Sequence, residues 1–255
     1  MKIKKIIKRL GGSSEKVCFL HLHKSGGTAL NDAILNSLDI ETKLLKKHIT
    51  MNPYARNEGA KILKKNSIEF SEEVMIYLLA SGNYHYISGH FECTERMLNN
   101  FSTQWNFITV LRDPVDRWFS HYFYNKYKKG DWYRIKESLE DFVHTERAKA
   151  YGHNYVQMLS GYQITEDNLN SAVEAAKNNL KYFKLVGILE EIEEFKDKYY
   201  QTFQRRLKLN QYKRKSPISS HERANLINSD IRQRVIALNK PNQELYEYAK
   251  ILANS

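Results

Sequence analysis

The sequence is poor in cysteine and has no long apolar run. Of its 255 residues only Cys18 and Cys93 are cysteines, and they form no CxxC pair. Such spacing provides neither a disulfide framework nor a zinc-binding pattern. No apolar run approaches the ~20 residues that span a bilayer, and the N-terminus has no signal-peptide h-region. These absences lead us to expect a cytoplasmic protein in a reducing compartment.

Basic charge, by contrast, is abundant. Forty Lys and Arg stand against 29 Asp and Glu, which gives a formal charge of +11. This balance suits a polyanionic partner such as a nucleotide, an acidic glycan, nucleic acid or a membrane, and it equally suits a solvated basic surface. Residues 1–10 place four aliphatic side chains at helical spacing among lysines, an arrangement that would allow contact with a membrane surface. We separate 1–15 as a basic N-terminal segment from a single domain at 16–255.

Apolar runs alternate with amphipathic segments through this domain. The expected strands are 16–22, 84–90, 105–114 and 184–189. The expected helices follow Thr28 and Pro114, cover 168–180 and 192–203, and close the chain with a break near Pro241. One or two surface helices are expected within 39–83, and a long loop at 205–220. The alternation predicts an α/β fold, a P-loop-like three-layer sandwich with a mainly parallel central sheet flanked by helices.

The segment HKSGGT, residues 23–28, connects the first expected strand to a helix. A strand that delivers a glycine-bearing loop to a helix N-terminus points backbone N–H groups into one concavity, where the helix dipole adds positive charge. Gly26 and Gly27 allow close approach of an anion. Thr28 adds a hydroxyl donor and Lys24 a full charge. Lys24 precedes the glycines, unlike the lysine of the GxxxxGK[ST] pattern of P-loop ATPases, and a simple glycine-rich turn is the alternative.

A second segment, VLRDPVDRWFSHY (110–122), also runs from a strand into a helix. Arg112 leaves the strand end, and Ser120 lies about two turns into the helix. In a parallel sheet both loops open on the edge where ligands bind. An arginine and a serine hydroxyl there would hold a second phosphate, the arginine in bidentate fashion. The alternative is a surface ion pair of Arg112 with Asp113 or Asp116.

Together, HKSGGT and RDPVDRWFSHY resemble two segments of the carbohydrate sulfotransferase superfamily in order, spacing and strand–loop–helix context. The resemblance is strongest to the branch of heparan sulfate 2-O- and 6-O-sulfotransferases and to bacterial-type sulfotransferases of family 2. Three later stretches also resemble blocks of the family: NYVQMLSGY (154–162), LVGILEEIEEF (185–195) and LNKPNQELYEYA (238–249).

The resemblance implies that the co-substrate is 3′-phosphoadenosine 5′-phosphosulfate. Lys24 would contact its bridging oxygen and sulfonate, residues 25–28 its 5′-phosphate, and Arg112 with Ser120 its 3′-phosphate. The residues so assigned are Lys24, Ser25, Gly26, Gly27, Thr28, Arg112, Ser120 and, in a looser match, Arg214, Lys215 and Ser216. His23 departs from the family, which has proline there, so the loop would be less rigid; His23 would approach the substrate or pack in the core.

Transfer of a sulfonate to a hydroxyl needs a base, and histidine is the usual one near neutral pH. His90 follows an expected strand and a glycine, so it should lie at the same sheet edge. HFECTE (90–95) also resembles a run that carries the catalytic histidine of the 6-O branch. Glu92 is the second candidate and His85 a third, whereas we expect His121 to pack beside the site.

A metal site is the competing use of histidine. His21 and His23 share one face of the expected strand, because side chains alternate along a strand. No nearby HxxE or Asp pattern completes a ligand set, so we expect no metal.

The sequence thus predicts a sulfotransferase that moves the sulfonate of 3′-phosphoadenosine 5′-phosphosulfate to a hydroxyl acceptor. The acceptor would be a carbohydrate or a small metabolite, and we expect no nucleic-acid partner. Two alternatives remain open: a P-loop-type nucleotide kinase, and a non-catalytic module that binds a polyanion such as a glycan.

Overall fold

The structure of the protein is a computed structural model that describes residues 15–209 and 218–254. The expected amphipathic segment 1–10 therefore lies outside the described residues. So do three of the residues matched to the nucleotide, Arg214, Lys215 and Ser216.

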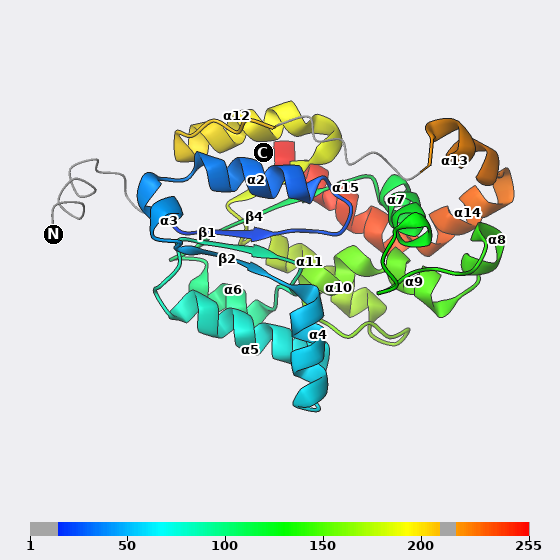
Figure 1. Cartoon of the computed structure of the whole chain (residues 1–255), viewed down its shortest axis with the longest axis horizontal. Coiled ribbons are helices and arrows are strands. Elements are labelled where there is room, and N and C mark those ends of the chain that lie inside the picture. Colours follow the sequence, from blue (N-terminus) through cyan, green and yellow to red (C-terminus); the bar gives the residue numbers. More distant parts are fainter. Residues whose placement is uncertain (1–14, 210–217, 255) are drawn as a thin grey trace, which may run out of the picture.

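A five-stranded parallel sheet forms the centre of the molecule (Figure 1). Its strands are β1 (Val17–Leu20), β2 (His48–Met51), β3 (Tyr86–Gly89), β4 (Asn106–Leu111) and β5 (Leu185–Ile188). Their order across the sheet is β2-β3-β1-β4-β5, and each neighbouring pair is parallel. All five carboxyl ends therefore open on one edge. The predicted α/β sandwich with a parallel central sheet is confirmed.

Both faces of the sheet are covered by helices, which explains why its strands are nearly continuous apolar runs. In β1, Val17 and Phe19 pack on one side, whereas Cys18 and Leu20 pack on the other. The first side carries α2 (Gly27–Ser37) and α12 (Ile192–Phe203). The second side carries α5 (Ser67–Ala80), α6 (Glu95–Phe101), α10 (Asn154–Ser160), α11 (Leu169–Leu180) and α15 (Lys240–Asn254).

A third apolar cluster lies beyond the carboxyl edge of the sheet and is built around Trp118. It joins α7 (Pro114–Tyr127), α8 (Leu139–Phe142), α9 (Glu146–Gly152) and α14 (Ser229–Leu238), with α13 (Ser220–Leu226) alongside (Figure 1). This cluster gives the loops at the sheet edge a rigid support.

The stretch 39–83 differs from the expectation of surface helices alone. It contains α3 (Ile40–Leu44), α4 (Pro53–Ile62) and α5, and it also supplies the edge strand β2. Only Met51 of β2 is buried, so the strand shows no apolar alternation that would reveal it. Helix α5 is likewise more than a surface helix, because Met75 and Leu79 lie in the core.

Among residues 15–209 and 218–254, no helix is both long and apolar enough to cross a membrane.

Candidate active site

The loop between β1 and α2 has the geometry of an anion site. Lys24 and Gly26 both have positive φ, 65° and 72°, which turns the chain sharply into α2. Gly26 is the N-cap and provides no side-chain hydrogen bond, and the first turn of α2 contains no acidic residue. The N-cap residue thus gives the N–H groups of this turn no side-chain cap, and the helix dipole adds positive charge beside them. Thr28 is exposed within the same turn.

Gly27 is required by packing rather than by its backbone angles. A Cβ built on Gly27 would meet the His21 ring at 1.8 Å. Gly26 is similarly restricted, because its Cβ would lie 2.7 Å from Leu189 Cδ1. The glycine pair therefore lets a histidine and a leucine approach the loop from two sides.

Tyr155 joins this loop to the second predicted loop. Its hydroxyl donates to the carbonyl of Arg112 at 2.9 Å and accepts from the Arg112 N–H at 3.0 Å. Because the Tyr155 hydroxyl proton is already donated to the Arg112 carbonyl, the Ser25 hydroxyl donates its own proton to the Tyr155 oxygen, 3.0 Å away. Tyr155 is fully buried and Ser25 is 1% exposed. The two loops are thus held side by side at adjacent strands β1 and β4.

Arg112 is further positioned by the chain's later segments. Its Nη1 donates to the Lys24 carbonyl at 3.5 Å, and its Nε lies 4.0 Å from Glu190 Oε1. Glu190 also accepts from the N–H of Asp113 at 3.2 Å and from the Tyr246 hydroxyl at 3.2 Å. The three later stretches singled out in the sequence, 154–162, 185–195 and 238–249, therefore each supply one residue here: Tyr155, Glu190 and Tyr246.

Helix α7 closes the other side of the site. Pro114 begins it and Asp113 caps it, accepting from the Asp116 N–H at 2.9 Å, as the sequence predicts. Ser120 is half-buried within it. Lys24 Nζ lies 4.0 Å from the ring centroid of Tyr124, one turn beyond Ser120. The side chain of Lys24 thus lies along the same helix as the predicted 3′-phosphate residue.

His90 lies at the start of the β3–α6 connection, in contact with the β1–α2 loop. Its Nδ1 is 2.5 Å from the His21 carbonyl oxygen, which can only accept, so Nδ1 carries the proton in the neutral ring. The His90 ring stacks on His23, with centroids 3.9 Å apart, and lies 4.3 Å from His21. The column continues from His23 to His121 at 5.4 Å and from His121 to Tyr151 at 4.0 Å.

The imidazoles of this column are held neutral. Burial lowers the pKa of His90 to about 4, and the Arg56 guanidinium adds to this, although the hydrogen bond to His21 acts in the opposite direction. Burial also lowers the pKa of His23 well below its usual range, and its neighbours His90 and His121 add to this, because two protonated imidazoles side by side would repel each other. The pKa of His121 falls in the same way, mainly through burial. At pH 7 His90 therefore carries a lone pair on Nε2.

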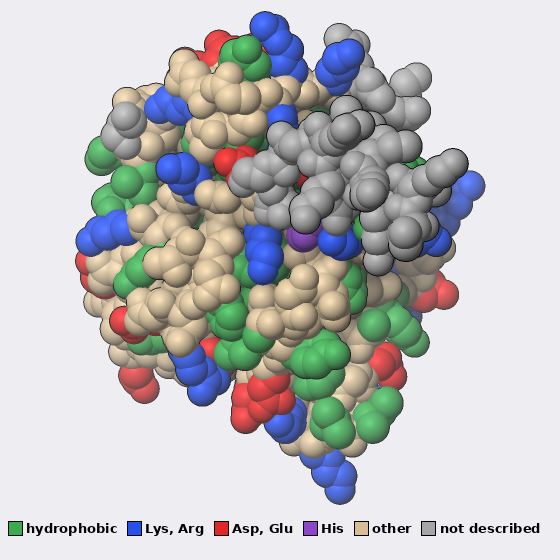
Figure 2. All heavy atoms as spheres, turned by 90° about the vertical axis from the view of Figure 1, so that its left-hand side faces the viewer, with side chains coloured by type: hydrophobic (Ala, Val, Ile, Leu, Met, Phe, Trp, Pro, Cys, Tyr) green, Lys and Arg blue, Asp and Glu red, His purple; other side chains and the backbone are tan. Residues whose placement is uncertain are grey.

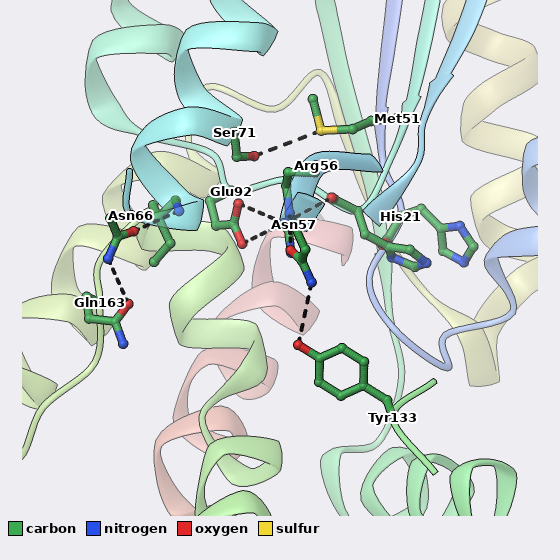
Figure 3. Close-up of polar contacts among 11 residues, drawn as sticks. His21, Met51, Arg56, Asn57, Asn66, Ser71, Glu92, Tyr133 and Gln163 are labelled. Atoms are coloured by element: carbon green, nitrogen blue, oxygen red, sulfur yellow. Dashed lines mark hydrogen bonds and ion pairs between the residues drawn. The ribbon is translucent and has the colours of Figure 1, made fainter. Parts of the chain in front are cut away.

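The other base candidates are placed differently. Glu92 is 3% exposed, and both of its carboxylate oxygens accept from Arg56 of α4 at 3.1 Å (Figure 3). Burial raises the pKa of Glu92, while Arg56 opposes this. Glu92 is thus an ion-pair partner that fixes α4 beside His90. His85 precedes β3, at the opposite edge of the sheet, where its Nδ1 lies 3.1 Å from Thr42 Oγ1.

Four partly exposed aromatic side chains, here called the aromatic rim, continue outward from Lys24. They are Tyr124, Trp132, Tyr133 and Tyr54, which are 37%, 45%, 54% and 55% exposed. Trp132 packs edge-on against Tyr133 at 4.7 Å and against Tyr54 at 6.1 Å. Lys128 Nζ lies 5.8 Å from the Tyr124 ring and 5.7 Å from Trp132. The rim is thus an exposed group of aromatic rings, two of which lie close to the Lys128 ammonium.

Two elements far apart in the sequence meet at this rim. Asn57 of α4 donates to the Tyr133 hydroxyl at 3.5 Å, beside the Arg56–Glu92 pair (Figure 3). Arg147 of α9 approaches Tyr133 from the other side, with its guanidinium carbon 5.5 Å from the ring. The stretch 39–83 and the 128–138 segment therefore form one wall together.

Positive charge gathers at this end of the molecule. Arg117 of α7 is fully buried, and its partners are neutral groups: the carbonyl of Tyr151, the amide of Asn154 and the ring of Tyr155. Figure 2 shows the opposite end, at the amino ends of the strands, where Lys and Arg side chains are interspersed with Asp and Glu. The Arg117 guanidinium, which lies against the Tyr155 ring, thus adds positive charge near the predicted anion site.

The described part of the chain contains no group of three or more His, Cys, Asp or Glu side chains suited to a metal ion.

No protein-family model matches the chain, and no curated protein is significantly similar to it.

Several residues of the site carry no sequence signal of their own. Tyr155, Glu190 and Tyr246 lie in stretches that resemble family blocks, which is the one signal that could have found them. Arg56 and Tyr124 lack even that, because an arginine in a polar helix and a tyrosine among several others are ordinary features.

Proposed function

We propose that the protein is a sulfotransferase that uses 3′-phosphoadenosine 5′-phosphosulfate. The observation that carries this proposal is the junction made by Tyr155. It holds an uncapped, lysine-bearing helix N-terminus beside an arginine loop, with a neutral histidine on a third loop at the same edge. Two separate cationic positions suit a donor with two separate phosphates.

The donor's 5′-phosphosulfate would lie in the β1–α2 loop, on the N–H groups that open α2, with Thr28 as a further donor. Its 3′-phosphate would lie at Arg112 and Ser120. Lys24, whose chain turns at a positive φ, would contact the oxygen between phosphorus and sulfur. A cation there stabilises the negative charge that the leaving phosphate gains as the S–O bond breaks.

His90 would be the general base. Its Nδ1–H is used by the His21 carbonyl, so Nε2 is the nitrogen that accepts the acceptor's hydroxyl proton. The acceptor oxygen attacks sulfur in line with the bridging oxygen, and the electron pair of the broken S–O bond stays on the 5′-phosphate. A positioned base of this kind contributes roughly 10²–10⁴-fold to the rate.

The acceptor would bind at the aromatic rim. Exposed rings present flat apolar faces to the C–H faces of a sugar, and Lys128 would attract a negative group on it. A carbohydrate hydroxyl is therefore the acceptor we favour, and a small ring-bearing metabolite is the alternative that the same surface would accept.

Titration calorimetry with the donor product, 3′-phosphoadenosine 5′-phosphate, tests this proposal. Wild type should bind it without magnesium, and its thermal stability should rise with the logarithm of the ligand concentration once this exceeds the Kd. Arg112→Ala should weaken binding by about 10-fold or more, since hydrogen bonds to charged groups contribute about 1.5–3 kcal/mol. Arg206→Ala, which changes an exposed arginine beyond α12, is the matched control and should bind as wild type does.

The absence of both binding and thermal stabilisation would refute the proposal. Magnesium-dependent turnover of ATP would favour the nucleotide kinase instead. Binding of polyanions that is unchanged in Arg112→Ala, and that weakens steeply with salt, would favour the binding module.

A further inference from the structure

The column of rings at the site has an unusual member. His23 lies between two other imidazoles, with its centroid 3.9 Å from His90 and 5.4 Å from His121, and the ring planes tilt by only 19° and 18°. The far end of the column is anchored, because the Tyr151 hydroxyl accepts from Asn125 Nδ2 at 2.7 Å. His23 therefore connects the proposed base to a fixed part of the third apolar cluster.

We propose that His23 is a positioning residue that holds the His90 ring, by stacking on its face, in the orientation that presents Nε2 to the acceptor hydroxyl. This inference rests on the proposed function, in which His90 is the base.

One hydrogen bond cannot orient His90 alone. The contact from Nδ1 to the His21 carbonyl fixes one edge of the ring but still lets the ring plane tilt about the Cβ–Cγ bond. His90 follows Gly89, the last residue of β3, whose φ of 139° favours glycine and whose backbone pairs with β1 and β2, so the sheet fixes where the His90 side chain begins but not the plane of its ring. A flat ring against the His90 face removes the remaining rotation, which an aliphatic side chain of similar size would do less well.

Burial keeps both stacked rings neutral, and the charges around the column add to this. Arg56 of α4 faces His90. His21, Arg117 and His121 face His23, and among the described residues the charged groups with the largest effect on either ring are all basic. The pKa of His23 is lowered by burial and then by His90 itself, so His23 does not compete for the proton that His90 receives. Once protonated, His90 would face the π system of a neutral ring, which is a favourable arrangement for a cation.

Two substitutions at His23 separate stacking from hydrogen bonding. His23→Ala removes the ring and admits water to His90, whereas His23→Phe keeps a flat ring and removes both nitrogens. The first measurement is the NMR titration of the His90 Cε1–H signal, which needs no catalytic activity. The second is the pH profile of sulfonate transfer, with the affinity for 3′-phosphoadenosine 5′-phosphate as a check that the donor site is intact. His144→Ala, on the exposed turn between α8 and α9, is the matched control.

His23→Ala should raise the titration midpoint of His90 from about 4 toward the unperturbed value near 6.5. The acid limb of the profile of kcat against pH should shift to higher pH with it. At pH 7, kcat should fall by about 10-fold or more because the ring is no longer oriented, and donor-product affinity should not change. His23→Phe should restore most of kcat and keep the low midpoint. His144→Ala should behave as wild type.

An unchanged His90 midpoint and an unchanged kcat in His23→Ala would overturn the proposal. So would a loss of kcat that His23→Phe fails to restore, because a ring nitrogen and not the stack would then be needed. Failure of wild type to transfer sulfonate would refute the proposed function instead, and the NMR titration would still report whether His23 governs the environment of His90.

Discussion

Lowering the pH from 7 to 5 should destabilise this protein before most of its carboxylates titrate. The stacked histidines are among the groups responsible, because their pKa values are lowered in the folded protein. Burial lowers the pKa of His90 to about 4 in the folded protein, against 6.5 in the unfolded chain. Between these values the unfolded chain binds more protons than the folded one, so the free energy of unfolding falls as the pH falls through the unfolded pKa. This loss begins near pH 6.5 and is complete below about pH 4.

The magnitude for His90 alone follows from that pKa difference. The folded pKa of about 4 lies about 2.5 below the unfolded value of 6.5, and each pKa unit corresponds to about 1.36 kcal/mol. Neutral His90 therefore contributes at most about 3 kcal/mol to the free energy of unfolding, of which about 2 kcal/mol is lost between pH 7 and pH 5. The pKa values of His23 and His121 are lowered as well, and both act in the same direction. Carboxylates with lowered pKa, such as Glu72, lose their contribution only below about pH 4.5.

Urea unfolding at pH 7, 6 and 5, followed by circular dichroism, measures this effect. His90→Asn keeps a donor for the His21 carbonyl but cannot titrate, so its stability should fall by about 2 kcal/mol less than that of wild type over this range. His144→Asn, at an exposed histidine, is the control and should follow wild type. Equal losses in wild type and His90→Asn would refute the reasoning, because His90 would then titrate alike in the folded and unfolded states.

Three further predictions concern the loops that meet at the site. Gly27→Ala should destabilise the protein by about 1–3 kcal/mol in thermal unfolding, because the new Cβ would lie 1.8 Å from the His21 ring. Gly130→Ala, which has open space around it, should have little effect. Tyr155→Phe should lower the free energy of unfolding by about 1–3 kcal/mol in chemical denaturation and weaken donor-product binding, since the buried Ser25 hydroxyl and the half-buried Arg112 N–H lose their acceptor. Tyr182→Phe, at an exposed ring, should change neither. Tyr124→Leu should lower turnover by about 2- to 5-fold, because the Lys24 ammonium loses a contact with an aromatic ring that contributes about 0.5–1 kcal/mol. Tyr124→Phe keeps an aromatic ring and should preserve turnover.

The placement of the two loops at one edge could be predicted because it follows from chain order. Strands that alternate with helices form a parallel sheet, and Lys24 and Arg112 each follow the carboxyl end of a strand. The capping of α7 by Asp113 was predictable for a similar reason, since an Asp–Pro pair is a local signal.

Other features depend on contacts that no local pattern encodes. Tyr155 lies 130 positions from Ser25, yet one hydrogen bond between them joins the loops. The stacking of His23 on His90 depends on side-chain rotamers in two loops, one after β1 and one after β3, so the sequence alone does not assign a role to His23. Strand β2 was missed because it lies at the sheet edge with one buried side chain, where alternation is not required.

The central claim is that the protein transfers a sulfonate with His90 as the base. The most direct measurement incubates purified protein with ³⁵S-labelled 3′-phosphoadenosine 5′-phosphosulfate and a library of carbohydrate and small-metabolite acceptors. The account predicts label in an acceptor with wild type, about 10²–10⁴-fold less with His90→Asn, and equal affinity of both for the donor product. Label that never leaves the donor, or transfer that is equally fast in His90→Asn, would contradict it.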